Sequence, residues 1–364
     1  MTAPVLASAA PAPRKIRVLT VDDSVVVRHL LRQVLRTDPG LELAGAASNG
    51  VMALAQIPVV KPDVVILDIE MPEMDGLETL RQIRRRHPQL RTIMFSTLTV
   101  RGASATFEAL SLGADDYLAK PSGAGLEQSM AGLAAELIPK IRQFFGSRAA
   151  PLPSALFPSP RPGLSRSRPR VVAIGVSTGG PQALSRLIPA IPAAFPLPIL
   201  VVQHMPAMFT RLLADRLRDL SSLKVEEAAD GAEIAPGRVL VAAGGYHLKV
   251  RRSGPFSFAA ALDQGPPENS CRPSVDVLFR SLAEHYGAGV LSVILTGMGR
   301  DGLRGVEALK AAGSSTLAQD EPTSVVWGMP GAVAQANLAD SILPLDGIAP
   351  ELVRRVGGAS RGGL

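Results

Sequence analysis

Short apolar runs alternate with longer segments of helical periodicity over the first 143 residues. Apolar runs with polar boundaries predict buried strands, and apolar positions spaced three and four apart predict amphipathic helices. The predicted strands are 16–21, 42–47, 63–67, 92–95 and 117–119, and the predicted helices are 24–36, 50–60, 76–86, 103–112 and one beginning near 126. This alternation predicts an α/β domain with a (βα)5 doubly wound parallel sheet, covered by helices on both faces.

The second half of the chain repeats the alternation with one interruption. The predicted strands are 171–176, 199–203, 290–295 and 316–319, and the predicted helices are 181–191, 209–217, 275–285 and 303–312. Between them, residues 238–243 and 246–262 are rich in strand-forming residues and contain glycine turns. We expect a second α/β domain, with a mainly parallel sheet and an antiparallel β insertion.

Residues 139–169 separate the two alternating halves and are rich in proline, serine and arginine. Such a segment cannot bury enough apolar surface to offset the entropy of ordering it, so we expect an extended, semi-stiff linker. Residues 1–13 lack a basic start and are interrupted by Pro4 and Pro11, which indicates a disordered tail and not a signal peptide. The predicted domains are therefore 14–138 and 170–358.

The positive charge of the chain is concentrated in the linker. Seven Lys and Arg residues and no acid lie between Leu137 and Arg170, and without them the net charge of +6 becomes −1. The linker is then a solvated spacer or a docking segment for an acidic surface. The single cysteine, Cys271, excludes an intrachain disulfide and fits a reducing compartment, so we expect a cytoplasmic protein. No apolar run reaches the ~18–20 residues that cross a bilayer, so no membrane insertion is expected.

Three carboxylates follow strands of the predicted first sheet. Asp22 and Asp23 end the first strand and Asp68 ends the third. Ligands of open α/β sheets bind at this edge, and Mg²⁺ prefers a few carboxylates with water and phosphate oxygens. Lys120 and Ser96 follow two other strands, so Asp68 could be a nucleophile that forms an aspartyl-phosphate. Taken singly, each carboxylate could instead cap a helix.

This pattern resembles the response regulator receiver domain over approximately residues 14–137. The matching motifs are VDDS, DVVILDIEMPEMDG, FST and YLAKPSG. The resemblance implies that Ser96 and Lys120 contact the phosphoryl group and that Tyr117 is the aromatic switch residue. It also implies that the Glu70 carbonyl completes a Mg²⁺ shell formed by Asp22, Asp23 and Asp68.

A serine follows the first strand of the second half, in the sequence GVSTGGP. Ser177 would lie at a strand-to-helix turn, where backbone amides at a helix start can stabilise an oxyanion. The sequence also matches the generic G-x-S-x-G pattern of serine nucleophiles. This match alone is weak evidence, because a Ser-Gly-Gly turn also caps helices or binds phosphate.

His204 and Asp301 follow two other strands and could complete a hydrolytic triad with Ser177. His204 would act as the base, and Asp301 would orient its imidazole ring. Asp301 could equally be a plain helix N-cap, and Asp320 is the other candidate carboxylate. The order Ser, His, Asp differs from that of α/β-hydrolases, but a triad is defined by geometry and not by order.

Together these motifs resemble the chemotaxis protein-glutamate methylesterase family, CheB, over nearly the whole chain except the N-terminal tail and the linker. The motifs that carry the resemblance are GVSTGGP, VVQHMP, FTRLLADRL, NSCRPSVDVLF, ILTGMGRDG and AQDEPTSVVWGMP, together with the receiver. It implies a triad of Ser177, His204 and Asp301, with Thr178 and Met298 beside it and the Met298 amide as an oxyanion donor. It implies no cofactor for the esterase chemistry. The sequence leaves the oligomeric state open, and we expect a monomer.

The implied reaction is hydrolysis of glutamate γ-methyl esters on chemoreceptors, with deamidation of specific glutamines. Phosphorylation of Asp68 by a chemotaxis histidine kinase would raise the activity. Two other classes stay open: the same triad acting on a non-chemotaxis ester or amide, and a transcription factor with a DNA-binding output. The location of the positive charge in the linker argues against the second, so no nucleic-acid partner is expected.

Overall fold

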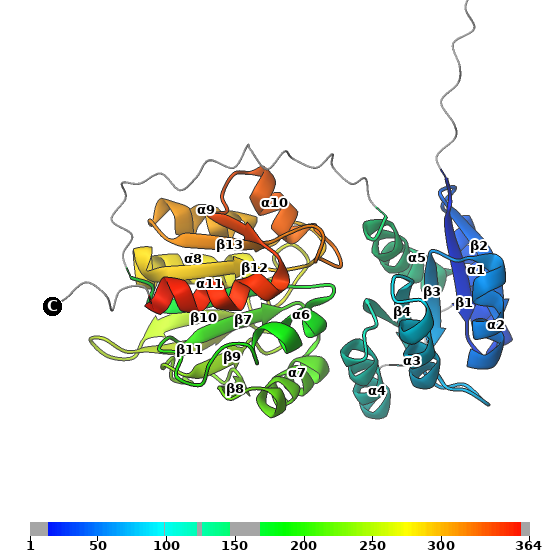
Figure 1. Cartoon of the computed structure of the whole chain (residues 1–364), viewed down its shortest axis with the longest axis horizontal. Helices are drawn as coiled ribbons and strands as arrows, with labels where there is room; N and C mark the ends of the chain where they lie inside the picture. The colour runs from blue at the N-terminus through cyan, green and yellow to red at the C-terminus, as the bar shows by residue number, and fades with distance from the viewer. Residues whose placement is uncertain (1–13, 98, 122–125, 146–167, 358–364) are drawn as a thin grey trace, which may run out of the picture. The chain divides into compact units, whose positions relative to one another are not determined.

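The computed structural model describes residues 14–97, 99–121, 126–145 and 168–357, which form α/β domains (Figure 1). The predicted disordered tail, residues 1–13, and linker residues 146–167 lie outside the described residues. No helix within these described ranges is both long and apolar enough to cross a bilayer.

The N-terminal domain contains a five-stranded sheet in the order β2-β1-β3-β4-β5. Its strands are β1 (Ile16–Val21), β2 (Leu41–Ala47), β3 (Val64–Asp68), β4 (Arg91–Ser96) and β5 (Asp116–Ala119). Its helices are α1 (Val25–Arg36), α2 (Gly50–Val60), α3 (Gly76–Arg86), α4 (Val100–Ser111) and α5 (Leu126–Gln143). The pairs β1–β2, β1–β3 and β3–β4 are all parallel, which confirms the predicted doubly wound sheet.

The helices of this domain start where a polar side chain can satisfy their free amides. Ser24, Asn49, Asp75 and Thr99 each accept a hydrogen bond from the first turn of the following helix. Such caps stabilise a helix by ~1 kcal/mol each. The α1 and α5 side chains cover one face of the sheet in a shared apolar core.

Helix α5 corrects the predicted start of the linker at residue 139. The helix continues through Pro139 to Gln143, so residues 139–143 are helical and not extended. Leu133, Leu137 and Ile141 are buried at intervals of four residues, and this apolar face continues beyond the proline. Packing of that face therefore outweighs the disfavoured proline.

The C-terminal domain contains a seven-stranded sheet in the order β14-β13-β12-β6-β7-β9-β8, and all six strand pairs are parallel. Its strands are β6 (Val171–Val176), β7 (Ile199–Gln203), β8 (Lys224–Glu227), β9 (Arg238–Val241), β12 (Val290–Ile294), β13 (Ser315–Gln319) and β14 (Ser341–Leu343). Its helices are α6 (Gly180–Leu187), α7 (Ala207–Leu220), α8 (Val275–Tyr286), α9 (Leu303–Ala311), α10 (Met329–Gln335) and α11 (Leu345–Gly357).

The predicted antiparallel insertion is smaller than expected. Among the named strands of the described residues, the one antiparallel pair is β10 (His247–Arg252) with β11 (Phe258–Asp263), which form a separate two-stranded sheet. Strand β9, which the sequence assigned to the insertion, pairs with β7 in parallel. Helix α6 also ends at Leu187, four residues before the predicted end. Ile188 still has helical dihedral angles, but Pro189 has no N–H with which to continue the helical hydrogen bonds.

Candidate functional site

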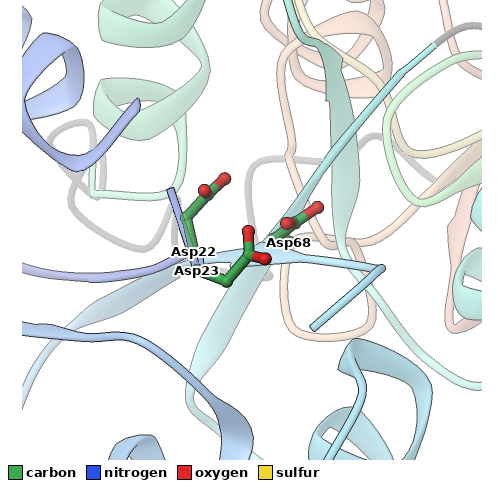
Figure 2. Close-up of side chains that lie close together, drawn as sticks. All are labelled: Asp22, Asp23 and Asp68. Carbon is green, nitrogen blue, oxygen red and sulfur yellow. The ribbon is translucent and has the colours of Figure 1, made fainter. Parts of the chain in front are cut away.

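The first candidate site lies at the carboxyl ends of β1 and β3 in the N-terminal domain. Carboxylate oxygens of Asp22, Asp23 and Asp68 lie within 4.8 Å of one another. Figure 2 shows these three side chains grouped together. Asp22 and Asp68 are buried, whereas Asp23 is exposed. Ser24, and not either neighbouring aspartate, caps α1, so helix capping does not explain these carboxylates.

Lys120 holds the two buried carboxylates together. Its Nζ lies 2.8 Å from Asp22 Oδ2 and 2.8 Å from Asp68 Oδ2. Burial raises the pKa of Asp68 to about 6, and the negative charge of Asp22 adds to this effect, although Lys120 opposes it. The Ile69 amide also donates to Asp68 Oδ1 at 2.7 Å. Asp68 is therefore oriented, with one oxygen against a cation.

The donor set of this site fits a hard divalent cation. Three converging carboxylates repel one another, and Mg²⁺ is bound by one or two such groups together with water and phosphate oxygens. Ser96 and Lys120 lie at the same end of the sheet: buried Ser96 ends β4, and its carbonyl accepts from the amide of Lys120, which follows β5, at 2.8 Å. Tyr117 lies in β5, and Glu70 follows β3 with an exposed side chain.

The second candidate site begins with Ser177 and His204 at the carboxyl edge of the seven-stranded sheet. Strands β6 and β7 are parallel neighbours in which Val176 pairs with Gln203, so Ser177 and His204 directly follow a register pair. The His204 amide donates to the Val176 carbonyl at 3.2 Å. Adjacent strands lie ~4.8 Å apart, so the two residues leave the sheet at neighbouring points.

The loop after β12 approaches the same serine. The Ser177 amide donates to the Thr296 carbonyl at 3.0 Å. A Cβ atom on Gly297 would lie 2.8 Å from Ser177 Cβ and would overlap the sulfur of Met329. Glycine at position 297 therefore permits the loop that carries Met298 to pass close to Ser177.

Asp301 joins His204 to the start of α8. His204 Nε2 lies 2.7 Å from Asp301 Oδ2. The other donors to this buried carboxylate are Asn269 Nδ2 (2.8 Å), Ser274 Oγ (2.8 Å), Val275 N (2.7 Å), Asp276 N (3.1 Å) and Gly302 N (3.1 Å). Helix α9 has Gly302 as its N-cap residue and no side-chain cap, so the interpretation of Asp301 as its N-cap is wrong.

The environment shifts the pKa values of this pair in opposite directions. Burial lowers the pKa of His204, but the hydrogen bonds with Asp301 and Cys271 outweigh burial and raise it to about 9. Burial raises the pKa of Asp301, but His204 and the α8 amides outweigh that and hold it well below its usual range. Near neutral pH the pair is therefore an imidazolium bound to a carboxylate.

The Ser177 hydroxyl and two nearby backbone amides are available to contact a substrate. Within the described residues, the Ser177 hydroxyl makes no hydrogen bond, and α6 has Gly179 as its N-cap residue with no side-chain cap. Among the same residues, the Thr178 and Met298 amides donate no hydrogen bond. The site thus combines a free hydroxyl, an oriented imidazole and unused amides, which together can perform acyl transfer.

The remaining candidates lie elsewhere or were missed by the sequence. Asp320 accepts hydrogen bonds from Thr323 in its own turn, so it is not the partner of His204. Sequence reasoning missed Asn269 and Ser274, which hold Asp301. The only available signal was their position in the NSCRPSVDVLF motif, directly before a predicted helix.

Comparisons with known proteins agree with this geometry. Two family models match the chain: the response regulator receiver domain over residues 18–129 and CheB methylesterase over residues 172–352. The second match assigns the output region to an enzyme family and not to a DNA-binding class.

Similar proteins extend these matches over most of the chain. A protein-glutamate methylesterase/protein-glutamine glutaminase of Trichodesmium erythraeum is 48% identical over 94% of this chain and 99% of its own length. One from a Nocardioides species is 46% identical over 94% of this chain and 95% of its own length. The crystal structure of the Thermotoga maritima CheB methylesterase catalytic domain has a TM-score of 0.50 at 42% identity, covering 52% of this chain and 99% of that one. The chain therefore belongs to the CheB family of protein-glutamate methylesterases/protein-glutamine glutaminases, with a response regulator receiver domain ahead of its methylesterase domain.

Proposed function

We propose that this chain is a phosphorylation-activated serine hydrolase. It demethylates glutamate γ-methyl esters on chemoreceptors and deamidates specific receptor glutamines to glutamate. The observation that carries the proposal is the His204–Asp301 hydrogen bond at the sheet edge where Ser177 directly follows the neighbouring strand. The family membership supplies the substrate class.

His204 activates Ser177 as a general base in this mechanism. Because Nε2 faces Asp301, the neutral imidazole carries its proton on Nε2 and offers Nδ1 to the Ser177 hydroxyl. The Ser177–His204 hydrogen bond forms when the substrate binds, since such bonds are often loose in the free enzyme. Asp301 keeps the tautomer and stabilises the imidazolium formed as Ser177 attacks the ester carbonyl.

Backbone amides stabilise the negative oxygen of the tetrahedral intermediate. Thr178 directly follows Ser177, and Met298 directly follows Gly297, which lies close to Ser177. Neither of their amides donates a hydrogen bond among the described residues, so both are candidates to donate to that oxygen. His204 then protonates the leaving methoxide, and water attacks the acyl-enzyme to release glutamate. Ammonia leaves in the same step when the substrate is a glutamine.

The receiver controls this activity through Asp68. Asp68 accepts a phosphoryl group from a chemotaxis histidine kinase. Mg²⁺, held by Asp22, Asp23, Asp68 and the Glu70 carbonyl, supplies charge neutralisation for this transfer when bound. Lys120 already contacts Asp68 and is placed to pair with the phosphoryl oxygens. The Ser96 hydroxyl donates a hydrogen bond to a phosphoryl oxygen. Tyr117 is the aromatic switch residue, whose side chain changes conformation when Asp68 is phosphorylated.

We assign the receiver to residues 14–143, which extends the predicted domain from residue 138 to the end of α5, and the methylesterase domain to residues 170–358. The protein acts as a monomer in the cytoplasm, without a nucleic-acid partner and without a cofactor for the ester hydrolysis. The single cysteine supports the cytoplasmic location, and the location of the positive charge in the linker supports the absence of a nucleic-acid partner.

The test is methanol release from a methylated chemoreceptor fragment by the full chain. Reactions contain Mg²⁺, with or without acetyl phosphate, and Ser177→Ala and Asp68→Ala run in parallel. We expect no release by Ser177→Ala and no stimulation of Asp68→Ala by acetyl phosphate. Release that persists in Ser177→Ala would contradict the assigned nucleophile, and stimulation that persists in Asp68→Ala would contradict the assigned phosphoacceptor.

A further inference from the structure

A buried glutamine connects the candidate nucleophile to the candidate base. Gln203 is the last residue of β7 and is 2% exposed. Its Nε2 donates to the Ser177 carbonyl at 2.9 Å and, more weakly, to the His204 carbonyl at 3.3 Å. One side-chain amide therefore restrains the backbone of both residues.

The oxygen of the same side chain packs against the start of α6. A Cβ atom on residue 180 would overlap Gln203 Oε1, so Gly180 leaves the space that the amide fills. The Gly180 amide donates to the same Ser177 carbonyl at 2.8 Å. The Ser177 turn is thus held from the α6 side and from the β7 side.

The buried amide carries a cost that an apolar residue would avoid. Gln203 Oε1 has no hydrogen-bond partner within the described part of the chain. An unpaired buried acceptor destabilises a fold, whereas methionine would fill similar space without that penalty. The amide group therefore contributes through its donors, whose partners among the residues that the structure describes are the carbonyls of Ser177 and His204.

We propose that Gln203 is a positioning residue that fixes Ser177 relative to His204 for attack on the ester. This inference rests on the proposed hydrolase function. Misplacing a reacting group by 1 Å can cost ~100-fold in rate, and Gln203 is the side chain whose donors join the two residues. It acts through their backbone and does not contact the substrate.

The experiment replaces Gln203 in the full chain with side chains of similar size that cannot donate both bonds. Gln203→Met removes both donors, and Gln203→Glu places a carboxyl against the two carbonyls. Methanol release is measured with Mg²⁺ and acetyl phosphate, so that kcat and KM are obtained in the activated state. We expect kcat to fall on the order of 10- to 100-fold, with KM within twofold of the wild type.

Thr316→Val is the matched control for lost stability. Thr316 is fully buried on β13 and shares a hydrogen bond with Ser292 at 2.8 Å, away from the carboxyl edge. We expect this variant to lower the melting temperature while kcat stays within threefold of the wild type. A kcat for Gln203→Met and Gln203→Glu that is also within threefold would overturn the positioning role.

A second readout separates this inference from the proposed substrate. The rate at which a fluorophosphonate probe labels Ser177 reports the reactivity of the nucleophile without any methyl ester. If the wild type is labelled but releases no methanol, the substrate assignment fails, and slower labelling of both Gln203 variants still supports positioning. If the wild type neither labels nor releases methanol, Ser177 is not a nucleophile and both proposals fail. If one Gln203 variant does not fold, kcat and the labelling rate of the other variant test the positioning role.

Discussion

Replacing Asp301 with asparagine tests the direction of the proposed proton transfer. Oδ1 of Asp301 accepts from a cluster of donors, whereas Oδ2 accepts from His204 Nε2 and the Val275 amide. An asparagine would keep its oxygen in the larger donor cluster and turn its NH₂ group toward His204. Nε2 would then have to accept, and the imidazole proton would move to Nδ1, the nitrogen that must deprotonate Ser177.

The size of the effect follows from the charge and the tautomer together. Raising the pKa of His204 from 6.5 to about 9 corresponds to about 3 kcal/mol of imidazolium stabilisation, or about 300-fold in an equilibrium or rate constant. The wrong tautomer increases this loss. In a serine protease, the equivalent Asp-to-Asn change alters the charge and the tautomer together and lowers kcat ~10⁴-fold. We therefore expect kcat for Asp301→Asn to fall by about 10³- to 10⁴-fold.

The assay is methanol release by the acetyl phosphate-activated full chain, with the melting temperature measured alongside. Ser274→Ala is the control, because it removes one donor to Asp301 but leaves the carboxylate and the tautomer unchanged. We expect that control to lose less than tenfold in kcat. An Asp301→Asn protein that is folded and retains more than a tenth of the wild-type kcat would refute the proposed role of the pair.

Three further predictions concern pH, stability and packing. Because the base must be neutral and the pKa of His204 is raised to about 9, kcat/KM measured by methanol release should rise about tenfold per pH unit up to about pH 9 and then level off; a flat profile from pH 7 to 9 would contradict this. Burial raises the pKa of Asp68 to about 6, so its favourable contribution to folding is present below pH 3.8 and is lost as pH rises through 6. Asp68→Asn should therefore stabilise the receiver by about 1–2 kcal/mol in denaturant unfolding at pH 7.5 without Mg²⁺, allowing for the ion pair lost with Lys120; an unchanged or lower stability would count against it. Gly297→Ala should lower kcat more than tenfold and cost about 1–3 kcal/mol in thermal unfolding, because its Cβ would press on Ser177; full activity would show that the loop can move aside.

The alternation of short apolar runs with amphipathic segments predicted most of the fold. The run 171–176 is entirely apolar or glycine and the run 16–21 is mostly apolar, and the structure contains strands with those bounds. The weakly patterned elements were missed: β8, with the sequence KVEE, and the three-residue β14 lie at the two edges of the sheet. Edge strands need less apolar surface, so their sequences carry little signal.

The candidate sites could be located from the sequence because parallel strands end at one edge. That rule brought Asp22, Asp23 and Asp68 together, and it placed Ser177 beside His204. It could not decide between the two interpretations of Asp301, because an aspartate before a helix is expected both in an N-cap and in a triad. The decision depended on α8, whose first turn comes from a segment about 25 residues earlier in the chain.

The attachment of Asp301 to the first turn of α8 bears on how relatives with altered sequences should be classified. This carboxylate anchors the start of α8 and the loop that carries Asn269, so its loss would damage the fold as well as the reaction. A relative that has lost all hydrolytic activity would still be under pressure to keep an acid at this position. Whether such a protein is an enzyme or an inactive signalling scaffold should therefore be judged from the equivalents of Ser177 and His204, and not from the aspartate.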